Sequence, residues 1–300
     1  MHTMRTLILL TMSASMAAAQ GATGASAVAG LREAIETRVG MVPGATVAVV
    51  HARVGGPPIV EVNADSVFHA ASTMKVPVMI EYFRALDDGR LRRDHALTLS
   101  TEFRSIVDGS PYSLGPGVDS DSTVFDRVGE QVPLRWLVER MIVRSSNLAT
   151  NALIELLDAK RVDATARALG TTKMKVLRGV EDSKAFQQGL NNQTSARDLA
   201  VLMQAIAAGT AASAEGSREM VGILARQEFN TEIPAGLPAG TRVAHKTGWI
   251  TRVLHDAAIV YPPQSEPYVL VVLTKGIADR TVARQLIADV SRLVWEHATR

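Results

Sequence analysis

A serine and a lysine separated by two residues, Ser72 and Lys75, are the first pair in the chain with the chemistry of an enzyme. They follow an apolar run and open a helical stretch that ends near Leu86. Pro77 falls in the first turn, where proline is tolerated. We therefore expect Ser72 at or near a helix N-cap, with the Lys75 amine within reach on the same helix face. A buried lysine with a lowered pKa can take the hydroxyl proton and make the serine a nucleophile.

Two more short motifs accompany this pair. A Ser-x-x-Lys pair occurs by chance about once in a few hundred residues, so alone it is best explained as a helix cap. However, Ser145-Ser146-Asn147 lies between two predicted helices, and Lys246-Thr247-Gly248 lies on a predicted strand. Two further motifs with serine and lysine in the same chain make a coincidence improbable. We therefore treat Ser72 as a candidate nucleophile and Lys75 as its candidate base.

Composition excludes several classes of function. A chain of 300 residues with 47% hydrophobic content can bury one large core or two modest ones. Its 32 Lys and Arg residues nearly balance its 30 Asp and Glu residues, so the pI near 9.0 does not indicate nucleic-acid binding. The chain has no cysteine, which excludes disulfides, thiolate chemistry and a lipidated N-terminal cysteine.

The first 19 residues have the pattern of a secretory signal. Arg5 precedes a short apolar run, and the small residues Ala17-Ala18-Ala19 come just before Gln20. This pattern predicts a signal peptide over 1–19 that is cleaved after Ala19, because the apolar run is too short to span a bilayer. We expect an exported protein, periplasmic or secreted, without a stable membrane anchor.

Hydrophobic periodicity predicts the elements that must position these residues. Helical patterns cover the residues 31–39, 73–86, 133–143, 147–157, 162–169, 195–208, 215–226 and 279–297. Strand patterns cover 45–50, 59–62, 242–247, 253–261 and 268–274. The segments 105–130 and 173–194 show little periodicity, and loops of this length are usually functional.

This order predicts an α/β fold of the α+β type. Residues 20–71 and 236–300 would form one lobe, a five-stranded antiparallel sheet built from both chain ends and flanked by terminal helices. Residues 72–235 would form an inserted all-α lobe. We expect the candidate site in a cleft at the junction between the lobes.

The three motifs, in this order and spacing, resemble those of the penicillin-recognising serine hydrolases, the family of serine β-lactamases and D,D-peptidases. The resemblance covers essentially the whole chain after the leader and implies a β-lactamase/transpeptidase-like fold. The chain is most similar to class A, in which a loop after the Ser-x-Asn motif carries a glutamate for deacylation. Glu181 lies 36 residues after Ser145 (181 − 145), in an irregular segment, which matches class A.

The resemblance implies a role for each residue in acylation. Ser72 would attack the lactam carbonyl, with an oxyanion hole made by the backbone N–H groups of Ser72 and Trp249, just past Gly248. Lys75, with or without Glu181 acting through water, would be the base; this assignment is disputed for class A.

The remaining roles concern substrate binding and release of the product. Ser145 would relay a proton to the lactam nitrogen, aided by Lys246, which also attracts the substrate carboxylate. Asn147 would hold the amide side chain of the substrate and Thr247 its carboxylate. Glu181 would activate the water that hydrolyses the acyl ester.

Each of these residues also has an ordinary structural explanation. Ser145 and Asn147 could cap the helix that follows them, and Lys246 could be a solvated strand residue. Glu181, next to Asp182 in a polar loop, could be a surface carboxylate.

Several positions depart from the class A pattern. Ser146 replaces the aspartate of Ser-Asp-Asn, which weakens the usual support of the cleft wall. Ala185 stands where an asparagine is expected four residues after the glutamate, so either Asn191 or Asn192 substitutes for it or the deacylating water is poorly held. The Ser105–Glu130 segment is longer than usual by about a dozen residues. Its Tyr112 either shapes the cleft entrance or is an ordinary surface tyrosine.

No other chemistry competes strongly. The histidines form none of the usual zinc motifs, and no glycine-rich phosphate loop follows a strand, so we expect no metal and no cofactor. His255 and Asp256 are expected to secure a strand near the cleft floor. The expected partner is a small β-lactam or a peptidoglycan peptide, and nothing requires more than a monomer. The functional alternatives are a class A serine β-lactamase, a D,D-peptidase that β-lactams acylate, and a non-hydrolysing β-lactam sensor.

Overall fold

The computed structural model describes residues 24–300, so the predicted signal peptide lies outside the described residues. The described part begins with a helix over 24–40. Two strands follow, β1 (Thr46–Arg53) and β2 (Pro58–Val62). Among these residues no helix combines the length and the apolar character needed to cross a membrane.

Both ends of the chain contribute to one five-stranded antiparallel sheet, as predicted. The last three strands are β9 (Arg242–Ile250), β10 (Val253–Tyr261) and β11 (Tyr268–Lys275). The strand order is β2-β1-β11-β10-β9, with β11 in the centre and β9 at one edge. The central strand is buried along almost its whole length because both faces of the sheet are covered.

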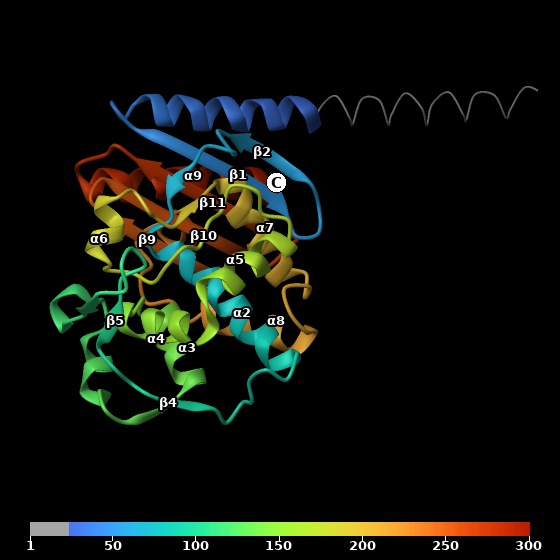
Figure 1. Cartoon of the computed structure of the whole chain (residues 1–300). Coiled ribbons are helices and arrows are strands. Elements are labelled where there is room, and N and C mark those ends of the chain that lie inside the picture. Colours follow the sequence, from blue (N-terminus) through green and yellow to red (C-terminus); the bar gives the residue numbers. More distant parts are fainter. Residues whose placement is uncertain (1–23) are drawn as a thin grey trace, which may run out of the picture.

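The two faces of the sheet belong to two hydrophobic clusters. Alternate residues of β1 point to opposite faces, so Val47 and Val49 join one cluster while Ala48 and Val50 join the other. The helix 24–40 and the last helix, α9 (Arg280–Ala298), cover the first face. Figure 1 shows the N-terminal helix above the sheet and the helical part of the chain on the other side.

The central part of the chain is mainly helical, as predicted. Its helices are α2 (Lys75–Asp87), α3 (Leu134–Val143), α4 (Asn147–Leu157), α5 (Ala159–Ala168), α6 (Ser183–Gln187), α7 (Ala196–Ala207) and α8 (Ala214–Leu224). Helix α2 is buried along most of its length and runs through the middle of this helical part (Figure 1). Ser195 caps α7 as predicted, since its Oγ accepts a hydrogen bond from Asp198 N at 3.1 Å.

Short elements that the periodicity did not predict occupy the long loops. Three two-stranded ribbons pair β3 (Phe68–His69) with β8 (Gln193–Thr194), β4 (Ala96–Thr98) with β7 (Gln131–Pro133), and β5 (Glu102–Arg104) with β6 (Pro111–Ser113). Four short 3₁₀ helices within residues 24–300 are η1 (Ala71–Met74), η2 (Pro116–Val118), η3 (Ser122–Arg127) and η4 (Ile233–Gly236). Strands of two or three residues are too short to give a periodic signal.

Candidate active site

Ser72 lies in the 3₁₀ turn η1, which leads directly into α2. Ser72 thus lies near a helix start, as predicted, but it is not the cap itself: the cap residue of η1 is Ala70, that of α2 is Met74, and neither has a side-chain cap hydrogen bond. The preceding residue, Ala71, has a positive φ of 46°. The turn therefore leaves the Ser72 hydroxyl partly exposed while its neighbours Thr73 and Lys75 are buried.

Strand β9 packs against this turn through Gly248. A Cβ on Gly248 would lie 2.9 Å from the backbone nitrogens of both Ser72 and Thr73, so only glycine fits there. This contact brings the Lys246-Thr247-Gly248 motif beside the candidate nucleophile. It also places the residue after the motif, Trp249, at the cavity that Ser72 lines.

The Ser145 hydroxyl bridges the two lysines. Lys75 Nζ lies 3.2 Å from Ser145 Oγ and Lys246 Nζ lies 3.0 Å from it, and all three side chains are buried. Lys75 Nζ also donates to Ser145 O at 2.7 Å and to Asn147 Oδ1 at 2.9 Å. A neutral amine can make these last two bonds and keep a lone pair for a hydroxyl proton.

Burial shifts the pKa of both lysines downwards. The pKa of Lys75 falls to about 7 because its ammonium is desolvated, although Asp119 and Glu181 favour the charged form. The pKa of Lys246 lies well below its ordinary value because of burial and the nearby charge of Lys75. An amine with a pKa near 7 suits a general base at neutral pH.

The Ser145–Asn147 turn presents its first and third side chains to Lys75. Ser145 has a φ of 57°, an uncommon conformation for a residue with a side chain. The helix cap is the middle residue, Ser146, whose Oγ accepts from Ala149 N at 3.1 Å. Capping therefore does not explain Ser145 and Asn147.

Glu181 lies across the cleft from this turn. Glu181 is exposed and lines the cavity, and its Oε1 accepts a hydrogen bond from Asn147 Nδ2 at 3.2 Å. Partial burial of the carboxyl raises the pKa of Glu181, against the opposing effect of Lys75 and Arg178. Glu181 thus faces the candidate site rather than open solvent alone.

A cavity of about 560 Å³ lies in front of these groups. Ser72, Asn147, Glu181 and Trp249 line it, while Lys75, Ser145 and Lys246 are buried behind them. Thr247 Oγ1 is buried as well, and within residues 24–300 no hydrogen-bond partner reaches it. An unpaired buried hydroxyl between Lys246 and Gly248 suits a polar group of a substrate.

Sequence reasoning missed the residues that hold the Glu181 segment. Asn151, one turn after Asn147 on α4, accepts from Val180 N at 2.6 Å and donates to Val180 O at 2.9 Å. The spacing of four residues from the motif on one helix could have revealed it. The Tyr112 hydroxyl reaches Val180 O at 3.3 Å, so this tyrosine supports the loop.

The two asparagines considered as substitutes at Ala185 serve another purpose. Asn192 Oδ1 accepts from Leu177 N at 2.8 Å, its Nδ2 donates to Arg178 O at 2.9 Å, and Asn191 Oδ1 accepts from Arg178 Nη2 at 3.1 Å. Both amides therefore hold the backbone and side chain ahead of Glu181. Ala185 is buried in α6.

The two histidines beside the site have structural partners. His255 Nε2 lies 2.9 Å from His69 O and links β10 to β3. His245 Nδ1 lies 2.9 Å from an Asp256 oxygen, and Asp256 also accepts from Ile233 N at 3.0 Å. Within residues 24–300 no three His, Asp or Glu side chains are grouped as metal ligands.

Comparison with known proteins agrees with this geometry. The profile of the "Beta-lactamase enzyme family" matches residues 30–298. The curated "Beta-lactamase 3" of Bacillus cereus is 28% identical over 170 residues, 54% of this chain and 53% of that protein, so the match spans about half the length of that relative.

Solved structures match over more of the chain. PBP-A is 30% identical with a TM-score of 0.75, covering 89% of this chain and 95% of that one, and a variant of it was solved as an acyl-enzyme complex with penicillin G. An ancestral class A β-lactamase is 25% identical with a TM-score of 0.77, covering 89% of this chain and 99% of that one.

Proposed function

The chain belongs to the β-lactamase enzyme family, and we propose that it is a class A-like serine β-lactamase that hydrolyses its substrate through an ester on Ser72. One observation carries the proposal most directly. The Ser145 hydroxyl joins the amines of Lys75 and Lys246, beside a serine turn that β9 approaches through Gly248. This arrangement offers a base, a proton relay and a second amine close to the turn that carries the Ser72 hydroxyl.

Acylation uses Lys75 as the base. Ser72 Oγ bonds to the lactam carbonyl carbon, its proton passes to the neutral Lys75 amine, and the Ser72 and Trp249 N–H groups bind the oxyanion. The C–N bond then breaks, and the lactam nitrogen takes the proton of the Ser145 hydroxyl. Lys75 returns its proton to Ser145 across their 3.2 Å contact.

Substrate binding uses the groups around this relay. The charge at Lys246 and the unpaired hydroxyl of Thr247 suit the carboxylate of a β-lactam. The side-chain amide of Asn147, which lines the cavity, suits the amide of the substrate side chain.

In deacylation, the second half of the reaction, Glu181 acts as the base. Its carboxylate removes a proton from a water molecule that attacks the ester carbonyl. The bond to Ser72 Oγ then breaks, and that proton restores the Ser72 hydroxyl. The raised pKa of Glu181 improves it as a base.

One observation favours a second function, a D,D-peptidase or penicillin-binding protein that β-lactams acylate. Asn151 on α4 holds the backbone of Val180, the residue before Glu181, whereas Glu181 itself contacts α4 through the 3.2 Å side-chain hydrogen bond from Asn147 Nδ2. Glu181 itself has a φ of 62°. The similarity to PBP-A, which matches at 30% identity, points the same way.

The two functions differ in turnover. We would mix the purified protein with a chromogenic cephalosporin and follow absorbance and intact mass together. Many turnovers per protein support the lactamase, whereas one long-lived adduct per protein favours the penicillin-binding function. Absence of both would reject the assignment to β-lactam chemistry.

Two variants test the individual roles. Glu181→Gln keeps acylation and lets the adduct accumulate, because the ester lacks its activated water; normal turnover would remove Glu181 from the mechanism. Ser72→Ala abolishes the adduct, and an adduct that persists would place the nucleophile elsewhere.

The proposal includes the cellular setting. The pattern of residues 1–19 supports export to the periplasm or the medium, and a monomer is a separate part of the proposal. The lobe boundaries at residues 71/72 and 235/236 are part of the same proposal. Mass analysis of the secreted protein and size-exclusion chromatography test cleavage and the monomer.

A further inference from the structure

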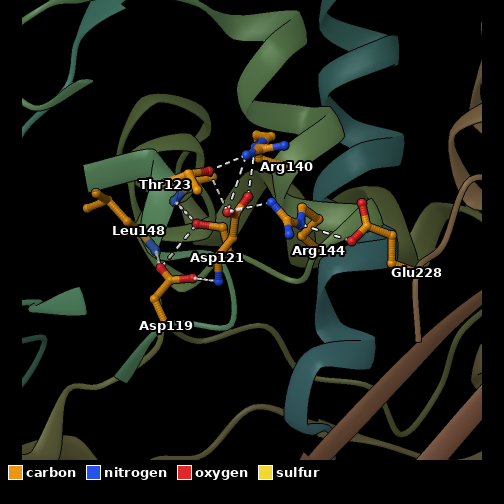
Figure 2. A network of polar contacts seen from close by, with 9 residues as sticks. Asp119, Asp121, Thr123, Arg140, Arg144, Leu148 and Glu228 are labelled. Atoms are coloured by element: carbon orange, nitrogen blue, oxygen red, sulfur yellow. Dashed lines mark hydrogen bonds and ion pairs between the residues drawn. The ribbon is translucent and has the colours of Figure 1, made fainter. Parts of the chain in front are cut away.

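The segment between η2 and η3 lies on the N-terminal end of α4. Val118 O accepts a hydrogen bond from Asn147 Nδ2 at 2.8 Å. The next residue, Asp119, accepts from Leu148 N at 2.7 Å and from Ser146 Oγ at 3.1 Å, both at its Oδ2. Figure 2 shows Asp119 beneath Leu148 and beside Asp121. A carboxylate from a distant segment thus binds the turn that carries two site residues.

We propose that Asp119 is a positioning residue for the proposed reaction, because its carboxylate holds the Ser145–Asn147 turn in the conformation that presents Ser145 and Asn147 to Lys75. This inference rests on the proposed function. Asp119 does not contact the reacting atoms itself; it acts through the turn.

The turn needs such support for a physical reason. A helix start leaves backbone N–H groups without partners, and a negative charge is favoured there. Ser146 satisfies Ala149 N with its own hydroxyl, and Asp119 satisfies Leu148 N. The positive φ of Ser145 adds strain that the surrounding contacts must hold. Asp119 therefore supplies the carboxylate that the Ser-Ser-Asn sequence lacks.

A buried ion pair fixes Asp119 from its other side. Asp121 N donates to Asp119 Oδ1 at 2.8 Å. The buried Asp121 carboxylate lies 2.7 Å from Arg140 Nε and 3.2 Å from Arg144 Nη1, at the C-terminal end of α3. Arg144 also pairs with Glu228 at 3.0 Å (Figure 2). The segment is thus tied to α3 at one point and to α4 at the next.

The negative charge of Asp119 also affects the pKa of Lys75, the proposed base. Its field raises the pKa of Lys75 against the larger effect of burial, and Glu181 acts in the same direction. Lys246 is the cation that faces Lys75 from β9. The carboxylate thus affects both the geometry and the charge around Lys75.

Asparagine at position 119 is a sharp test because both carboxylate oxygens accept a backbone N–H. An amide has only one acceptor oxygen, so Asp119→Asn must turn its NH₂ group towards either Asp121 N, which loosens the hold on Asp119, or Leu148 N, which breaks the bond to the turn; in both orientations the negative charge at the start of α4 is lost. The side chain keeps its size but loses one bond. We expect acylation by a fluorescent penicillin to slow about tenfold or more, as for one lost hydrogen bond to a charged group.

Rescue separates positioning from simple structural support. Ser146→Asp moves a carboxylate into the turn itself, so it should restore acylation in the Asp119→Asn background. In the wild-type protein the same change places two carboxylates side by side and should slow acylation. Asp126→Asn, an exposed change on the same segment, is the matched control and should leave acylation unchanged.

The rates are measured well below the melting temperature of each variant. Wild-type rates for Asp119→Asn, or failure of Ser146→Asp to restore the lost rate, would overturn the inference. A wild-type protein that the penicillin never labels would instead reject the proposed function.

Discussion

Replacing Gly248 by alanine should damage the candidate site more than its small size suggests. The new Cβ would lie 2.9 Å from Ser72 N, 2.9 Å from Thr73 N and 3.2 Å from Thr73 Cγ2. Comfortable contacts of a carbon atom begin near about 3.5 Å, so β9 and η1 must separate by about half an ångström. Neither element is free to move.

Both elements are held by their neighbours. Strand β9 is paired with β10 along its whole length, with Gly248 opposite His255, and Thr73 Oγ1 donates to Ala70 O at 2.6 Å within the turn. The displacement therefore falls on the junction where Ser72 N and Trp249 N would bind the oxyanion. Overpacking of this kind costs about 1–3 kcal/mol, and a misplacement of about 1 Å can cost about a hundredfold in rate.

We expect Gly248→Ala to slow acylation by about ten- to a hundredfold and to lower the free energy of unfolding by about 1–3 kcal/mol. Rapid-mixing kinetics with a penicillin and urea titration measure the two effects. The matched control is Gly222→Ala in α8, where the nearest atom to the new Cβ is 3.8 Å away. It should keep the acylation rate and gain up to about 1 kcal/mol of helix stability. A Gly248→Ala protein with wild-type acylation would refute the argued contact between β9 and Ser72.

Three further predictions follow from local geometry. Because burial lowers the pKa of Lys75 to about 7, its amine is protonated below that pH and cannot accept a proton. The rate of acylation should therefore rise as the pH increases through 7 and then reach a plateau. An acylation rate that is unchanged in acid would place the base elsewhere. Asp182→Asn weakens bonds to Ser105 and Ile106 that fasten the loop of Glu181, so intact-mass kinetics should show deacylation slowing more than acylation, and equal slowing would contradict this. Ser195→Ala removes the cap of α7 and should lower the unfolding free energy by about 1 kcal/mol, measured in urea, with acylation as the unchanged control.

The elements bounded by local signals were predictable. Helix α4 and strand β10 occupy the predicted residues, 147–157 and 253–261. Helix α4 begins directly after a serine cap, and strand β10 ends directly before Pro262-Pro263. In both cases the residues that mark the boundary are adjacent to the element in the sequence. The five-stranded sheet followed from the order of such elements, because one antiparallel sheet is the simplest assembly of strands from both chain ends, whereas the order of its strands was not predicted.

Contacts between distant residues were not predictable in the same way. The sequence placed Ser72 near a helix start, but it did not indicate the 3₁₀ turn, which follows a positive φ at Ala71 that no neighbouring residue type predicts. Asp119 lies 29 residues before Leu148 (148 − 119), in a segment without periodicity. A single sequence shows which groups can accept a hydrogen bond, but the partner depends on how the loops fold over α4.

The position of β11 has a consequence for how the protein folds. This strand is the centre of the sheet, although it is the last of the five to leave the ribosome. After β2 ends, more than 200 residues (268 − 62) must be synthesised before β11 is available to pair with β1. Such long-range pairing slows folding and leaves strand edges open to aggregation. Strand β9, which packs on the serine turn through Gly248, lies at the edge of this sheet, so the sheet behind the candidate site is complete only after β11 has been made.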